Sequence, residues 1–278
     1  MVSFRNQLIC LDEVSQQFLR LLVALGGYCT ATQAQALFPR SATQVRARLR
    51  TLERLGFLRR ITKYPVVYQI TKSTTRLLKR DASSRRQHTL STVQARLLAV
   101  HFYLEARAWP SEFVLDHEQK IAVFTDLAGC PLSSLPQRGG KPYLREHFLL
   151  WQPDWCLAIA MIDLPQPGLL MRLKLFIREF LPLLRHLHKE PDLLIVTADK
   201  GRAHVYERLK RHRAIRKLGL GELSNQIKPY PVKPPVPSIA SLTWPTADKH
   251  GESLEVEQSH HLSHTDAHQK HSRELIYE

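Results

Sequence analysis

The sequence predicts an α+β helix-turn-helix domain followed by an α/β domain and a disordered C-terminal tail. Within the first eighty residues, two similar helix-start signals precede two adjacent β-prone runs. Beyond about residue 90, short apolar runs alternate with long helical stretches, the pattern of an α/β domain. From Lys228, the segment KPYPVKPPVPS has five prolines in eleven residues. This composition cannot bury enough apolar surface to fold.

Length and composition place the domain boundaries. A chain of 278 residues is long enough for two domains. The polar stretch before the long helix at residue 90 lacks apolar periodicity and is predicted to be a linker. The resulting organisation is a first domain at 1–80, a linker at 81–90, an α/β domain at 91–227 and a Pro/His-rich disordered tail at 228–278.

The formal net charge of +15 points to a polyanionic partner. Residues 1–80 hold 14 Lys or Arg against 3 acids, a net charge of +11. A second cluster at 200–217 has 8 basic residues and one acid. No apolar stretch reaches the roughly 20 residues of a membrane span, and the N-terminus lacks a signal-peptide pattern. We therefore expect a cytoplasmic protein without a membrane partner. The four cysteines lie far apart without ligand spacing, which indicates neither a disulfide framework nor a zinc site, so reduced thiols in the core are expected.

The first helix is predicted from Asp12 to the Gly26-Gly27 pair, because its apolar residues recur on one face. The segments TATQ (30–33) and SATQ (41–44) each place a hydroxyl residue three positions before a glutamine, the capping-box arrangement. Two helix starts eleven residues apart predict a helix-turn-helix.

Two β-prone runs, FLRRIT (57–62) and VVYQIT (66–71), are joined by three residues and predict a hairpin. Three helices and a basic-tipped hairpin make a winged helix. The segment TLERLGFLRRITKYPVVYQIT resembles the winged-helix DNA-binding domains of bacterial regulators.

The third helix has an apolar sector and an opposite, basic sector at about 100° per residue. The basic sector suits the major groove, because arginine can pair with guanine or hold phosphates while small residues permit close approach. The hairpin could clamp the neighbouring backbone. The predicted DNA-binding residues are Thr43, Gln44, Arg46, Ala47, Arg50, Arg54, Arg59, Arg60, Lys63 and Tyr64. The alternative is a protein-interaction module with an exposed basic face. That alternative does not explain the net charge of +11 on this domain.

The second domain begins with a predicted amphipathic helix at 90–109. Strands are expected at KIAVF (120–124), WCLAIAMI (155–162) and DLLIVTA (192–198), with a long helix at 169–188 that Pro182 should kink. The order strand, strand, long helix, strand, basic helix is that of PD(D/E)xK-type nucleases, which have a restriction-endonuclease-like fold.

More narrowly, the chain resembles the replication-relaxation family of plasmids and integrative mobile elements. The residues that carry this resemblance are Pro153-Asp154 before WCLAIAMID, the helix with RLKLFIREFLPLL, and DLLIVTADKGRAHVYERLK. The family joins an N-terminal winged helix to a degenerate nuclease-like domain. The resemblance implies a role in plasmid replication or transfer control.

Catalysis by the second domain would need a metal ion and a basic residue. In an active nuclease of this class, two acids at strand ends hold Mg²⁺ and a lysine follows the second acid by two positions. Asp154 and Asp163 match the acids and are the candidate catalytic and metal-binding residues, but Pro165 stands at the lysine position. Lys174 on the following helix is a candidate replacement. Both aspartates also suit a purely structural role in turns.

The preferred interpretation is a DNA-binding protein with a catalytically inactive second domain and no cofactor. Its partners would be double-stranded DNA and replication or transfer proteins, and a homodimer stays open. One alternative is a Mg²⁺-dependent DNA endonuclease. Another is a transcriptional repressor whose second domain senses a ligand or dimerises.

Overall fold

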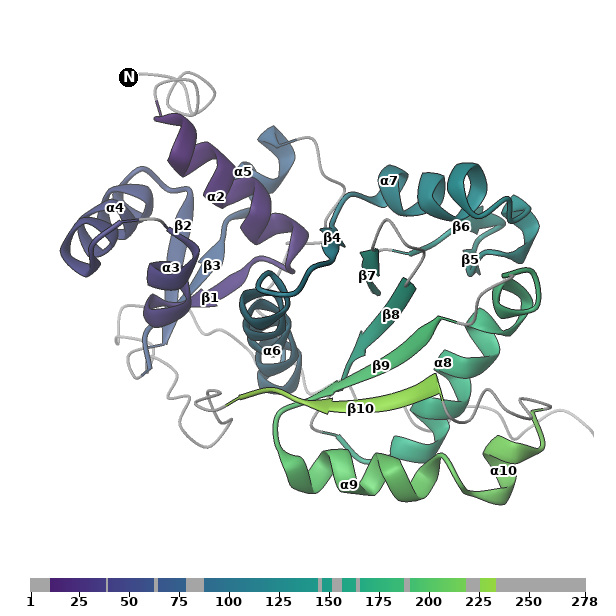
Figure 1. The fold of residues 1–278 in the computed structure, drawn as a ribbon. Helices are drawn as coiled ribbons and strands as arrows, with labels where there is room; N and C mark the ends of the chain where they lie inside the picture. Colours follow the sequence, from purple (N-terminus) through teal and green to yellow (C-terminus); the bar gives the residue numbers. More distant parts are fainter. Residues whose placement is uncertain are drawn as a thin grey trace, which may run out of the picture. The chain divides into compact units, whose positions relative to one another are not determined.

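The described residues of the N-terminal part form four helices around a three-stranded antiparallel sheet (Figure 1). The structure is a computed structural model that describes residues 11–38, 40–62, 65–78, 88–144, 147–151, 157–163, 166–187, 191–218 and 226–233. The elements of this part are α2 (Glu13–Ala24), β1 (Tyr28–Thr30), α3 (Ala31–Leu37), α4 (Ala42–Arg54), β2 (Leu58–Thr62), β3 (Val67–Ile70) and α5 (Lys72–Leu77). The strand order is β1-β3-β2.

The predicted helix starts are confirmed. Thr30 caps α3 and Ser41 caps α4, and in each case the glutamine three residues later completes the capping box. Asp12 caps α2, whose end is followed by Gly26 and Gly27 at φ 102° and 85°. The hairpin is also confirmed as β2 and β3, whereas β1 was not predicted. β1 has only three residues and exists through its pairing with β3.

The rest of the described chain is built on a five-stranded mixed sheet of order β10-β9-β8-β7-β4. The strands are β4 (Glu112–Val114), β7 (Phe148–Trp151), β8 (Leu157–Ile162), β9 (Asp192–Thr197) and β10 (Ile227–Pro231). β8, β9 and β10 are mutually parallel, and β4, β7 and β8 are antiparallel. The helices are α6 (Leu90–Ala106), α7 (His117–Ala122), α8 (Leu169–Leu184), α9 (Lys200–Leu209) and α10 (Arg213–Arg216). A short hairpin of β5 (Gln137–Arg138) and β6 (Lys141–Pro142) lies apart from this sheet.

Alternate residues of the central strands face opposite sides of the sheet, as the two-residue period of a strand requires. Leu193 and Ile195 pack in one core with α8, α9 and α10. Leu194 and Val196 pack in another core with α6. The sheet is therefore covered on both faces, which explains why the predicted strands at 155–162 and 192–198 read as continuous apolar runs.

Helix α6 is buried on several sides and is not the amphipathic helix that its apolar stripe predicted. Its Val93 and Leu97 pack against Tyr28, Ile61 and Val67 of the three-stranded sheet. Other α6 residues, among them Leu98 and Phe102, pack against the five-stranded sheet. One helix therefore contributes to two hydrophobic cores. Two hydrogen bonds also join it to the N-terminal part: Gln33 of α3 donates to Leu97 O of α6 at 2.7 Å, and Arg96 of α6 donates to Gly26 O at 2.6 Å.

Two predictions for the second domain need correction. KIAVF (120–124) is not a strand, because Asp116 caps α7 by accepting from two backbone N–H groups, and a π-helical segment (Val123–Leu127) continues it. The fold also extends past Lys228, where the tail was expected to begin. Lys228 to Pro231 belong to β10, an edge strand that tolerates proline because one side of its backbone has no partner strand.

The described residues of 1–244 form one compact unit, while residues 81–87 of the predicted linker and 234–278 of the predicted tail lie outside the described ranges. Among the described residues, no helix is long and apolar enough to cross a bilayer. Cys29 and Cys130 are buried free thiols, as expected, and burial raises the pKa of Cys29 to about 12.

Candidate nucleic-acid interface

Helix α4 presents a fixed outer face because its inner face is anchored in the N-terminal core. Val45, Leu49 and Leu52 are fully buried in that core. At the first turn, the Gln44 N–H donates to Ser41 Oγ at 3.4 Å, and the Ser41 N–H donates to Gln44 Oε1 at 3.3 Å. The cap and the buried stripe together set which side chains of α4 face solvent.

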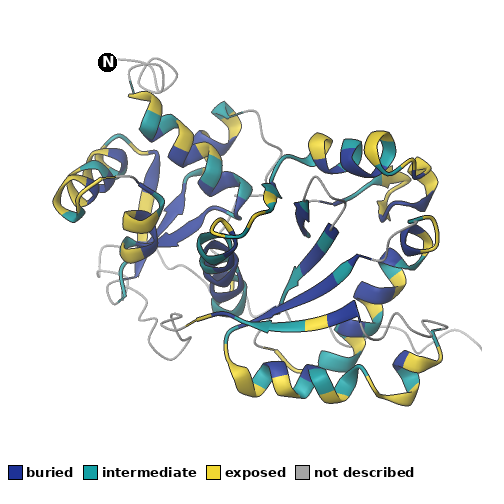
Figure 2. Ribbon diagram, in the orientation of Figure 1, coloured by how far each residue is buried: buried dark blue, intermediate teal, exposed yellow. Residues whose placement is uncertain are grey.

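The outer face of α4 contains every residue that the sequence predicted there. Figure 2 shows exposed positions along the outer side of the helix. The exposed residues are Thr43, Gln44, Arg46, Ala47, Arg50, Thr51 and Arg54. The acid of this helix, Glu53, is half-buried and lies 3.1 Å from Arg60 Nη2 of β2. The exposed face of α4 therefore carries three arginines and no exposed carboxylate.

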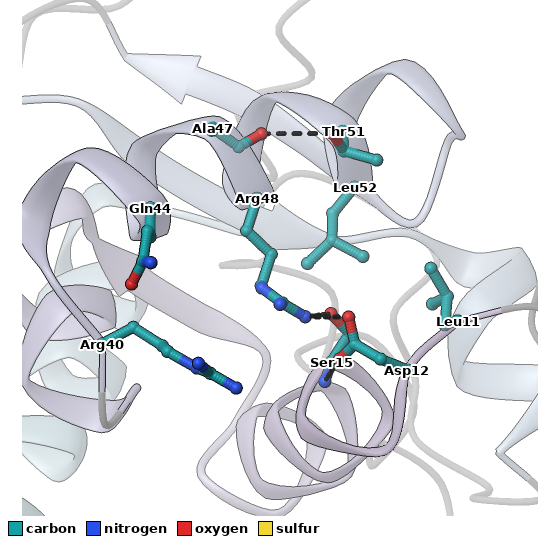
Figure 3. Close-up of a pocket in the computed structure, with 9 residues that line it drawn as sticks. All are labelled: Leu11, Asp12, Ser15, Arg40, Gln44, Ala47, Arg48, Thr51 and Leu52. Carbon is teal, nitrogen blue, oxygen red and sulfur yellow. Dashed lines mark hydrogen bonds and ion pairs between the residues drawn. The ribbon is translucent and has the colours of Figure 1, made fainter.

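Arg48 is turned away from this face and ties α4 to the start of α2. Its Nη1 contacts the Asp12 carboxylate and lies 2.6 Å from Ser15 Oγ (Figure 3). Burial opposes ionisation of Asp12, but the Arg48 guanidinium and the Ser15 N–H outweigh it and lower the pKa of this carboxyl. Arg48 is thus occupied in holding α4 against α2.

A cavity of about 400 Å³ lies between α4 and the start of α2. Figure 3 shows its lining, which includes Arg40, Gln44, Ala47 and Thr51 as well as the Arg48–Asp12 pair. Arg40 is exposed and was not among the predicted site residues. Its position just before the Ser41 cap is the sequence signal that could have identified it, since residues before a recognition helix lie beside its N-terminus.

The predicted hairpin residues are partly engaged within the protein. Arg59 Nε donates to Gln69 Oε1 at 2.8 Å, and Arg60 pairs with Glu53 and lies over the Tyr68 ring at 5.9 Å. Both arginines are exposed. Lys63 and Tyr64, the predicted hairpin tip, lie outside the described residues.

The second candidate site centres on Asp163, which follows β8 and is 3% exposed. Tyr206 of α9 donates its hydroxyl to Asp163 Oδ1 at 2.7 Å. Arg202 Nε contacts Oδ2, and Arg172 Nη2 of α8 lies 3.4 Å from Oδ1. Burial and the neighbouring carboxylate raise the pKa of Tyr206, and the hydrogen bond to Asp163 raises the pKa of Arg202.

These contacts give both oxygens of Asp163 a partner inside the protein. A metal ion would have to displace a guanidinium or the phenol to reach the carboxylate. Lys174 lies two residues after Arg172 on α8, about 200° round the helix, so it projects away from the side that contacts Asp163. Among the described residues, no three His, Cys, Asp or Glu side chains are grouped to hold a metal. Asp154 and Pro165 lie outside these residues.

The partners of Asp163 were not identified from the sequence. Arg202 and Tyr206 lie 39 and 43 residues further along the chain, and no local pattern links them to Asp163. They meet because the parallel pairing of β8 with β9 brings the start of α9 to the end of β8.

In comparisons with known proteins, no family model, no curated protein and no solved structure matches the chain.

Proposed function

We propose that the protein binds double-stranded DNA through the outer face of α4, as the recognition helix of a winged helix. The observation that carries this proposal is the set of exposed Arg46, Arg50 and Arg54 around small Thr43 and Ala47, with no exposed carboxylate on the helix. A net charge of +11 over residues 1–80 supports a polyanionic ligand.

The spacing of these residues fits one groove. Positions 43, 46, 47, 50 and 54 fall within a sector of about 100° and extend over about 16 Å at 1.5 Å per residue. A major groove about 12 Å wide admits a helix, and arginine can pair with guanine O6 and N7 there. Small Thr43 and Ala47 allow the helix backbone to approach the bases, while Arg40, exposed just before the Ser41 cap, can contact a phosphate.

We further propose that the second domain is nuclease-like in fold but inactive. The order of β7, β8, α8, β9 and α9 supports the first part, and the engagement of Asp163 by Arg172, Arg202 and Tyr206 supports the second. With the resemblance to the replication-relaxation family, we propose plasmid replication or transfer control as the biological role.

The DNA-binding proposal is tested with Arg46→Ala/Arg50→Ala. We expect weaker binding to a duplex selected by the wild-type protein, and a plot of log affinity against log salt that is flatter by about 1.8, at about 0.9 for each phosphate that is no longer neutralised. The measurement is a fluorescence anisotropy titration at several salt concentrations. Arg178→Ala/Arg185→Ala on and after α8 removes the same charge from exposed positions and serves as the control. Unchanged affinity and slope in the α4 variant would refute the assignment of α4.

The inactivity of the second domain is tested separately. Supercoiled plasmid incubated with the wild-type protein and Mg²⁺ or Mn²⁺ should stay intact. Nicking or linearisation that Asp154→Ala or Asp163→Asn abolishes would instead establish the endonuclease alternative.

A further inference from the structure

A second strongly basic surface lies on α9, α10 and the turn between them. Its exposed basic residues are Lys200, His204, Arg208, Arg211, His212, Arg213, Arg216 and Lys217, and we call it the α9–α10 surface. The acid within residues 200–217, Glu207, is paired with Lys210 at 2.6 Å. The Glu207 side chain stays 40% exposed, and Asp199, which caps α9, is exposed beside Lys200, so exposed cations outnumber exposed carboxylates on this surface.

The packing of α9 fixes the direction in which these cations point. Ala203 and Tyr206 are buried against the sheet, and the Tyr206 hydroxyl is held by Asp163. Lys200, His204 and Arg208 fall within a sector of about 80° on the side away from Tyr206. Arg211 follows in the turn after the helix. Figure 2 shows exposed positions along the outer side of α9. The stripe on α9 extends over about 12 Å at the rise of an α-helix.

We propose that the α9–α10 surface is a second DNA-binding surface, which holds the phosphate backbone of duplex DNA without reading its sequence. A row of cations of this length spans several phosphates, since one strand presents a charge about every 3.4 Å along the helix axis. Four of the exposed cations are arginines, whose planar guanidinium groups match phosphate geometry.

The composition of the surface favours nucleic acid over an acidic protein partner. Protein interfaces depend on buried apolar and aromatic anchors at their centre. The large exposed apolar side chains of the described chain are Leu127, Leu132, Met171 and Leu175, all outside residues 200–217. The α9–α10 surface thus has the charge that a DNA backbone requires and lacks the anchors that a protein interface requires.

The test uses the full chain and a labelled duplex of random sequence. Arg208→Ala/Arg211→Ala/Arg213→Ala is compared with Lys141→Ala/Arg178→Ala/Arg185→Ala, which removes the same charge from exposed positions elsewhere. The α9–α10 variant should flatten the log–log salt dependence by about 2.7, so that the wild type loses about 40-fold more affinity between 50 and 200 mM salt than the variant does. Circular dichroism and thermal unfolding check that both variants fold.

Each outcome decides the proposal. Equal behaviour of the α9–α10 variant and its control overturns the proposal, whatever the Arg46→Ala/Arg50→Ala variant shows. A loss confined to the selected sequence also overturns it, because backbone contact is independent of sequence. Poly-glutamate that competes as well as unlabelled duplex at equal charge would refute nucleic acid as the ligand. If the α9–α10 variant loses affinity and the Arg46→Ala/Arg50→Ala variant does not, the result supports the α9–α10 surface and refutes the proposed role of α4.

Discussion

Replacing Asp163 by asparagine should destabilise the fold, because the carboxylate pairs with two guanidinium groups and accepts a hydrogen bond from the Tyr206 hydroxyl at the end of β8. Asparagine keeps the shape and one acceptor oxygen for Tyr206, but it removes the charge. Breaking a buried ion pair from one side typically costs about 3–5 kcal/mol. Since 21% of the Arg172 side chain and 27% of the Arg202 side chain are exposed, water can solvate part of the orphaned charge. We therefore expect a loss of about 2–3 kcal/mol in the free energy of unfolding.

Chemical denaturation of the wild type, Asp163→Asn, Tyr206→Phe and the double variant measures this loss and its coupling. Tyr206→Phe removes a hydrogen bond to a charged acceptor, which is worth about 1.5–3 kcal/mol. The double variant should lose less stability than the sum of the two single losses, because the Tyr206 hydroxyl bonds a charged acceptor only while residue 163 is an aspartate. Asp126→Asn, at an exposed carboxylate, is the control and should change stability by less than about 0.5 kcal/mol. A change this small in Asp163→Asn as well would refute a structural role for Asp163.

Two further predictions concern stability. Burial of His147, helped by nearby Lys120, lowers the pKa of this imidazole to about 4, so the unfolded chain binds a proton that the native protein excludes. The free energy of unfolding should therefore fall by up to roughly 3 kcal/mol as the pH drops from about 6.5 to about 4. Chemical denaturation at several pH values should show a weaker fall for His147→Phe than for the wild type. An equal fall in the two proteins would contradict the role of His147. Gly27→Ala should cost about 1–3 kcal/mol, because Gly27 has φ 85° and an added Cβ would lie 2.9 Å from Ile70 Cγ2. Gly139 also has a positive φ, 59°, but an added Cβ there would meet nothing within 4 Å, so Gly139→Ala is the control. If thermal unfolding showed as large a loss of stability for Gly139→Ala as for Gly27→Ala, the contact with Ile70 would be unimportant.

The sequence predicted those parts of the candidate sites that depend on helical period. The cap at Ser41 and the buried Val45, Leu49 and Leu52 orient α4, so its exposed arginines followed from spacing alone. The pairing of Arg48 with Asp12 and Ser15, which keeps it off the exposed face of α4, was not predicted, because these partners lie more than thirty residues earlier in the chain. The contacts of Asp163 were missed for the same reason.

The structural signals in the sequence are local: they set where α2, α3 and α4 begin, the β2–β3 hairpin, and the apolar runs of β8 and β9. Capping, periodicity and β-propensity act within a few residues, and each of these elements contains its own signal. Long-range contacts make β1, β4 and β10 strands, because such short segments become strands only by pairing with a neighbour. They also place α6 between two sheets and surround Asp163 with cations, since both arrangements join residues far apart in the chain.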